Sequence, residues 1–460
     1  MLHVVLVAAV AALVGFWGLD QANIGPDELI YQDAGLRYVL GDTTPNPEHP
    51  PVAKYLLGVW QLVFGAGVTS ARVLMGVVLV ATTLVAFCWA RAAFGATAGV
   101  VGAIMLATTH RVSGADFIDR QVLLDPFSVL FGLSGLALLW HWERQRRMAG
   151  ALAAGALLAL GMLSKASAAT LLIAALACVP WRELGRREVW GAMVAFAAAG
   201  IGTCLLAYAP LGGLTAVQAM LEFQGAHASA GHPIVVAGET FLHAPWYALV
   251  WFAGEVVGWL ALAAVVGSAL IAAGVRWRDR ATRVLVLAAT GPLLVLSASP
   301  VALPHYTSAW LWPVLLLSGV GVVEVSRRAR SRIARVVAGG LGALLLVGPW
   351  TGVAHVVSIA PTGVARVDAA MAADPAPDGV VLTVQLSPWI TDPNIDAAVT
   401  EDERAPGITA VIVGDDIRFP APPALLDAVA AVEEPLALDG VLVYLLDEEL
   451  STLIGEGEAR

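Results

Sequence analysis

The sequence predicts an all-α protein that crosses a membrane many times and ends in a small soluble α/β domain. Apolar residues make up 58% of the 460 residues and charged residues only 13%, against about 25% charged residues in an ordinary soluble domain. The apolar residues form continuous stretches close to the ~20 residues that a spanning helix needs. A transmembrane β-barrel would instead alternate apolar and polar residues. The net charge of −10, without a stripe of lysine and arginine, excludes a nucleic-acid-binding protein.

Eleven apolar stretches predict about eleven transmembrane helices. They cover residues 4–19, 73–90, 95–110, 122–141, 148–163, 166–181, 189–209, 244–273, 284–300, 306–325 and 336–353. Between the first two stretches lies a long polar segment, residues 20–70, in which 28–40 and 52–64 are amphipathic. These two pieces predict helices that lie along the membrane surface.

Arginine clusters predict the orientation of the chain. They follow the second, fourth, sixth, eighth and tenth apolar stretches, so all of them share one side of the membrane. The positive-inside rule makes that side cytoplasmic. The segment 20–70, the loop near 210–243 and the C-terminal tail are therefore expected on the extracytoplasmic face.

The tail differs in charge from the rest of the chain. Residues 361–460 carry 19 acidic and 4 basic side chains, whereas residues 1–360 carry 17 acidic and 22 basic ones. Apolar runs at 380–386, 409–413 and 441–446 predict strands, and 422–432 predicts a helix with proline at its start. We therefore expect a membrane domain over 1–360 and an acidic extracytoplasmic α/β domain over 361–460, which caps the membrane domain or recognises an acceptor.

Few basic side chains are expected on the outer side of the membrane domain, and those few are candidates for chemistry. The only two lysines of the chain, Lys54 and Lys165, both lie there. Asp27 and Glu28 come just after the first apolar stretch. A carboxylate at this place suits a general base that takes a proton from a hydroxyl. It equally suits the first turn of a helix, where it complements the helix dipole, and the spacing leaves both interpretations open.

An Asp-Glu pair after the first span, followed by the His-Pro-Pro-x-x-Lys motif of His49–Lys54, resembles the protein O-mannosyltransferases and the lipid A aminoarabinose transferases. These are GT-C glycosyltransferases that use polyprenyl-phosphate sugars. The resemblance covers about residues 1–330. Further matching motifs are Arg120–Asp125, Gly161–Lys165, Gly231–Pro233 with Pro245–Tyr247, and Pro304–Tyr306.

The resemblance implies roles for the matching residues. Asp27 becomes the catalytic base, with Glu28 beside it to orient or bind the acceptor. The residues implied to bind the donor phosphate are Lys54, Arg120, Lys165, His305 and Tyr306. Those implied to contact the substrate are His49, Asp125, His232 and Trp246. Two structural alternatives stay open: Asp125 pairs with Arg120, and Trp246 belongs to the aromatic belt at the membrane interface.

The predicted function is therefore a multi-pass glycosyltransferase of the plasma membrane. It would move a mannose-like hexose or a pentose from a polyprenyl-monophosphate donor to a hydroxyl of a glycan, lipid or protein on the extracytoplasmic face, with inversion. No metal site and no cofactor besides the donor lipid are predicted, although a divalent metal stays an alternative. A lipid or solute transporter and a non-catalytic assembly subunit are the rival classes. A transporter predicts charges in mid-membrane and internal repeats, whereas here the charges gather at the outer rim.

Overall fold

The computed structural model describes residues 1–19, 26–109 and 120–358, together with four strands after residue 379. The chain divides into two compact units. The first contains Met1–Leu19 and Ile30–Ser358, and the second contains Asp20–Leu29 and Ile359–Arg460.

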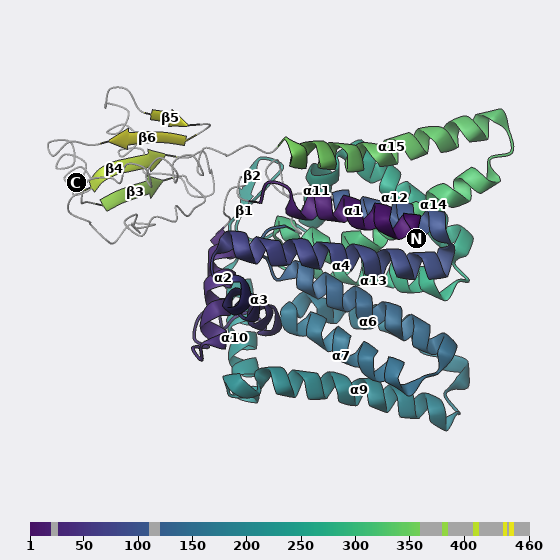
Figure 1. Cartoon of the computed structure of the whole chain (residues 1–460), viewed down its shortest axis with the longest axis horizontal. Helices are drawn as coiled ribbons and strands as arrows, with labels where there is room; N and C mark the ends of the chain where they lie inside the picture. The colour runs from purple at the N-terminus through teal and green to yellow at the C-terminus, as the bar shows by residue number, and fades with distance from the viewer. Residues whose placement is uncertain are drawn as a thin grey trace. The chain divides into compact units, whose positions relative to one another are not determined.

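The first unit is a bundle of long helices. Figure 1 shows α1, α4, α6, α7 and α9 running side by side. The long helices of the bundle are α1 (Leu2–Phe16), α4 (Val68–Phe94), α5 (Ala96–Thr109), α6 (Asp125–Gln145), α7 (Met148–Ser164), α9 (Arg187–Tyr208), α12 (Trp259–Arg276), α13 (Arg280–Ser297), α14 (Ser308–Arg328) and α15 (Arg332–Val357).

Two predicted helices are broken. The stretch 166–181 forms only the short α8 (Leu171–Ala175) between 3₁₀ turns. The stretch 244–273 divides into α11 (Ala248–Val257) and α12 at Gly258, whose φ of 85° lies in the left-handed region that glycine tolerates. An apolar run alone does not reveal such a break, because glycine does not interrupt the hydropathy.

The length and hydropathy of the helices are those of a multi-pass membrane protein. Among the described residues, five helical segments are long and apolar enough to cross a membrane. They are Val68–Phe94, Arg187–Leu211, Trp259–Arg276, Arg280–Ser297 and Pro304–Arg328. The number of eleven spans stays a prediction.

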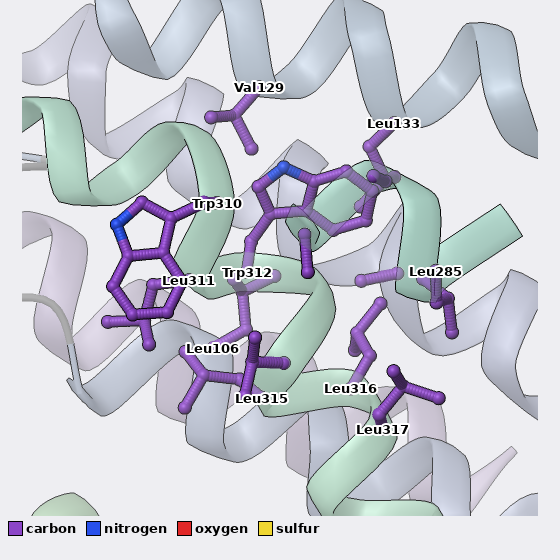
Figure 2. Close-up of a cluster of buried hydrophobic side chains, with 14 of the residues drawn as sticks. Leu106, Val129, Leu133, Leu285, Trp310, Leu311, Trp312, Leu315, Leu316 and Leu317 are labelled. Carbon is purple, nitrogen blue, oxygen red and sulfur yellow. The ribbon is translucent and has the colours of Figure 1, made fainter. Parts of the chain in front are cut away.

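Helix α14 is the centre of the bundle. Trp312, Leu315 and Leu316 are fully buried on it, and Figure 2 shows them packed with side chains of α5, α6 and α13, among them Leu106 and Leu133. Small residues allow its closest approaches, as is usual between membrane helices. They occur at Gly319 against Gly102 of α5 and at Gly321 against Ser268 of α12.

Salt bridges connect the arginine-rich helix ends on one side of the bundle. Arg146 contacts Glu183 at 3.1 Å, and Arg276 contacts Glu324 at 2.7 Å. Arg280 is also paired with Glu143. These contacts join the C-terminal ends of α6, α12 and α14 with the start of α13 and the segment after α8. Four of the five arginine clusters therefore lie at one end of the bundle, as predicted.

Short elements cover the opposite end of the bundle (Figure 1). They are α2 (Pro26–Val39), α3 (Val52–Phe64), α10 (Leu214–Ala230) and the hairpin of β1 (Ile234–Val236) and β2 (Glu239–Phe241). The segments predicted as surface helices, 28–40 and 52–64, thus form α2 and α3.

The C-terminal strands form one mixed sheet in the order β3-β4-β6-β5. The strands β3 (Val380–Val384) and β4 (Ile408–Val413) are parallel, and β6 (Val441–Leu445) is antiparallel to β4 and to β5 (Leu436–Leu438). Strands are present at all three predicted places. β5 was missed because it has only three residues, although the Asp-Gly dipeptide at 439–440 is a hairpin signal. The predicted helix 422–432 lies outside the described residues.

Candidate functional site

A buried ion pair joins two of the predicted site residues. Asp125 is the first residue of α6, and Lys165 directly follows α7. Because α6 and α7 are antiparallel neighbours joined by a short turn, the start of one lies beside the end of the other. Lys165 Nζ is 2.5 Å from Asp125 Oδ2, with the side chains 7% and 3% exposed. Lys165 is thus an ion-pair partner of Asp125, whereas the sequence alternative named Arg120.

The 3₁₀ turn Pro304–Thr307 before α14 adds two more predicted residues to this pair. His305 Nε2 lies 3.9 Å from Asp125 Oδ2. The Tyr306 ring centroid lies 4.4 Å from Lys165 Nζ, a cation–π distance. We call Asp125, Lys165, His305 and Tyr306 the Lys165 cluster. It places a cation, an imidazole and an aromatic ring around one carboxylate at the end of the bundle that α2, α3 and α10 cover.

Arg120 lies just before α6 and is buried. Its Nη2 donates to the Trp17 carbonyl oxygen at 2.6 Å. Arg72 of α4 likewise donates to the Leu19 carbonyl oxygen at 2.7 Å. Both guanidinium groups therefore bind backbone at the C-terminal end of α1, where carbonyls have no partner within the helix.

Lys54 of α3 has no exposed surface. Its ammonium donates to the Tyr38 hydroxyl at 2.9 Å, to the His49 carbonyl oxygen at 2.9 Å and to the Asn46 carbonyl oxygen. It also lies 4.5 Å from the Tyr38 ring centroid. Burial lowers the pKa of Lys54 to about 7, since removing water disfavours the charged form.

His49 is near enough to both Lys54 and Lys165 for the two positive charges to act on its imidazole. Its ring packs edge-on against Tyr31 of α2, with centroids 5.7 Å apart. Burial, and then the positive charges of Lys165 and Lys54, lower the pKa of His49 to about 3. The imidazole is therefore neutral at physiological pH.

Two further predicted residues come from the segment after α10. The backbone N–H of His232 donates to the Leu242 carbonyl oxygen at 2.8 Å, and its ring centroid lies 5.5 Å from that of His227. Trp246 is 75% exposed. The ring of His227 also stacks on that of Phe223, four residues earlier on the same face of α10. The sequence did not single out His227.

Asp27 and Glu28 lie in the first turn of α2. Glu28 is fully buried and Asp27 is partly exposed. The helical repeat puts Asp27 one turn before Tyr31. Both interpretations of the pair, as a general base and as a helix start, agree with this position.

Among the described residues, no three His, Cys, Asp or Glu side chains converge as metal ligands do. Asp116 and Asp119, two acidic residues that shortly precede Arg120 in the sequence, lie outside the described residues.

Residues 48–212 match the family described as dolichyl-phosphate-mannose-protein mannosyltransferase. The matched range contains Lys54, Arg120, Asp125 and Lys165. No curated protein sequence matches the chain.

The fold is similar to those of two proteins of known structure. ArnT from Cupriavidus metallidurans, solved in the apo state and bound to undecaprenyl phosphate, matches with TM-scores of 0.57 and 0.58 and identities of 15% and 16%. Each match covers 97% of this chain and 98% of that one. The archaeal oligosaccharyltransferase AglB from Archaeoglobus fulgidus, in complex with an inhibitory peptide and a dolichol-phosphate, matches with a TM-score of 0.50 and 11% identity. That match covers 90% of this chain and 69% of AglB. The predicted resemblance to GT-C glycosyltransferases is confirmed.

Proposed function

We propose that the protein is a membrane glycosyltransferase that moves one sugar from a polyprenyl-monophosphate donor to an acceptor hydroxyl. The observation that carries the proposal is the Lys165 cluster, a set of buried polar groups at one end of the helix bundle. The family match over residues 48–212 and the likeness to ArnT, solved with undecaprenyl phosphate, support it.

The reaction needs a stabilised leaving group. The bond between the sugar C1 and the phosphate oxygen breaks, and a bond from C1 to the acceptor oxygen forms, so that the donor leaves as a phosphate monoester with added negative charge. Fixed cations in a partly dry site stabilise such charge well. We assign this role to Lys165, with His305, Tyr306 and Arg120 as further donor contacts.

The acceptor hydroxyl must lose its proton as it attacks. We assign the role of general base, which takes this proton, to Asp27. Glu28 is assigned to binding or orienting the acceptor. One in-line displacement with one base inverts the anomeric carbon. His49, Asp125, His232 and Trp246 are proposed to contact the sugar or the acceptor.

The setting of this reaction follows the charge pattern of the chain. We propose that the bundle crosses the plasma membrane about eleven times, with its arginine-rich end in the cytoplasm. The site and the domain 361–460 then face outward. The sugar is a mannose-like hexose or a pentose, and the acceptor is a glycan, a lipid or a protein.

Binding and transfer test the proposal separately. The purified protein in lipid nanodiscs is mixed with a synthetic short-chain polyprenyl phosphate, and binding is followed by calorimetry. Transfer is then measured by mass spectrometry from polyprenyl-phosphate mannose and polyprenyl-phosphate arabinose to a mixed glycan and lipid acceptor pool. We expect binding in the wild type, weakened at least about tenfold in Lys165→Met because a charge-assisted contact is lost. Absence of binding in the folded wild-type protein would refute the proposal.

A further inference from the structure

One buried side chain binds the loop between α2 and α3, residues 40–51, at two of its carbonyl oxygens. Lys54 donates to the Asn46 and His49 carbonyl oxygens of this loop and to the Tyr38 hydroxyl of α2. An ammonium group has three N–H bonds, and each of them has an acceptor here. The Tyr38 ring, 4.5 Å away, adds a cation–π contact to the same charge.

The loop needs such an anchor because it has no regular structure of its own. Asn46 adopts a positive φ of 52°, a conformation that costs energy for a non-glycine residue. The loop is also held from α10, whose Gln224 Nε2 donates to the Glu48 carbonyl oxygen at 2.8 Å. Without Lys54, the carbonyls of Asn46 and His49 would lose a strong donor at a site where water does not reach the lysine.

The same geometry argues against a direct contact between Lys54 and a phosphate. A phosphate ligand would have to take an N–H from one of the three acceptors and reach a side chain with no exposed surface. Lys165 differs, because its described hydrogen bond goes to one carboxylate oxygen of Asp125, which an anion can replace as the charge partner.

We propose that Lys54 is a positioning residue: it fastens the 40–51 loop and thereby sets the place of His49 beside the Lys165 cluster, and it does not itself contact the donor phosphate. The effect of Lys54 on donor binding rests on the proposed function, whereas the fastening of the loop is independent of any reaction.

Protonation gives the anchor a pH dependence. The groups that face Lys54 are Tyr38 of α2, Tyr55 beside it on α3, and Glu48 and His49 of the loop. Burial places the pKa of Lys54 at about 7. A neutral amine has two N–H bonds for the two carbonyls and a lone pair that can accept from the Tyr38 hydroxyl. The positive charge is nevertheless lost as the pH rises through 7, and with it the cation–π contact and the charge that strengthens the hydrogen bonds to the loop.

Hydrogen exchange tests the anchor without donor or acceptor. In the full-length protein in nanodiscs, Lys54→Met and Tyr38→Phe should both speed amide exchange across residues 40–51, by about tenfold in Lys54→Met and less in Tyr38→Phe. Tyr55→Phe is the matched control. Its hydroxyl donates to the Ala207 carbonyl oxygen at 3.4 Å, so exchange in the loop should stay at the wild-type rate. Lys165→Met should also leave the loop unchanged. Unchanged exchange in both Lys54→Met and Tyr38→Phe would overturn the proposal.

Binding of short-chain polyprenyl-phosphate mannose and of short-chain polyprenyl-phosphate arabinose separates an anchor from a ligand, because the loop positions His49, which is proposed to contact the sugar or the acceptor. Tyr38→Phe frees one N–H of Lys54: it should weaken binding if Lys54 acts through the loop, and leave it equal or tighter if Lys54 holds the phosphate. We expect weaker donor binding in Tyr38→Phe and in Lys54→Met than in the wild type. The affinity of the wild type should also fall above pH 7, whereas that of Lys54→Met should not. Equal or tighter binding in Tyr38→Phe, together with lost binding in Lys54→Met, would overturn the proposal. If Lys54→Met does not fold, Tyr38→Phe and its control still decide. If neither the wild type nor any variant binds the donor, but exchange in the loop speeds up as expected, the proposed function is refuted. The role of Lys54 in fastening the loop is then still supported.

Discussion

Lys165 and Asp125, forty residues apart in the chain, form a buried ion pair with 2.5 Å between Nζ and Oδ2. The pair fixes the end of α7 against the start of α6, and His305 and Tyr306 complete the group from the turn before α14. A buried pair is costly to form, and costlier to break on one side, because an uncompensated charge then stays buried. Single and double variants of this pair can therefore distinguish a contribution to stability from a contribution to donor binding.

Removing one partner of the pair should destabilise the bundle. Lys165→Met and Asp125→Asn should each cost about 3–5 kcal/mol of unfolding free energy, measured by thermal unfolding in detergent. The double variant should recover much of the loss, because no unpaired charge remains. Donor binding should stay weak in the double variant if Lys165 contacts the phosphate. Full recovery of donor binding would show that Lys165 serves structure only.

Asp27→Asn should lower turnover about 100-fold or more, which is the scale of losing a general base. The amide keeps the size of the side chain but does not accept the proton. Affinity for a polyprenyl phosphate should change little, since other residues hold that group. Glu28→Gln should affect acceptor affinity more than turnover. Single-turnover transfer assays measure both variants, and a fully active Asp27→Asn enzyme would remove Asp27 from the mechanism.

The predicted orientation can be read by cysteine labelling in intact cells. Cys88, Cys178 and Cys204 are first replaced by serine or alanine, because all three are free thiols. A cysteine at Leu40, which is 68% exposed, should react with an impermeant thiol reagent. A cysteine at Arg146 should react only after the cells are opened. The opposite pattern would put the site on the cytoplasmic side.

Acid should destabilise the loop region through His49. Its pKa is about 3 in the folded protein and about 6.5 in an unfolded chain. Between these two values the imidazole is protonated in the unfolded state and neutral in the folded state. The free energy of unfolding therefore decreases as the pH falls from 6.5 toward 3. Thermal unfolding of His49→Gln should show a shallower loss over this range than the wild type. Identical slopes would mean that the fold does not hold the His49 imidazole neutral.

Local patterns in the sequence determined most of the architecture. Continuous apolar runs predicted the helices of the bundle, because composition alone decides whether a segment is stable in lipid. Amphipathic spacing predicted α2 and α3, and alternating charge in the loops predicted that the arginine clusters share one end. The motifs around His49–Lys54, Arg120–Asp125 and Lys165 were sufficient to indicate the GT-C resemblance.

Tertiary structure decided which side chains meet. Asp125 pairs with Lys165, forty residues away, because antiparallel packing of α6 against α7 brings the two helix ends together. The sequence marked Lys54 as an isolated cation, but only the folded 40–51 loop supplies the carbonyls that surround it. Such partners depend on contacts between segments distant in the chain, and hydropathy and spacing carry no information about those contacts.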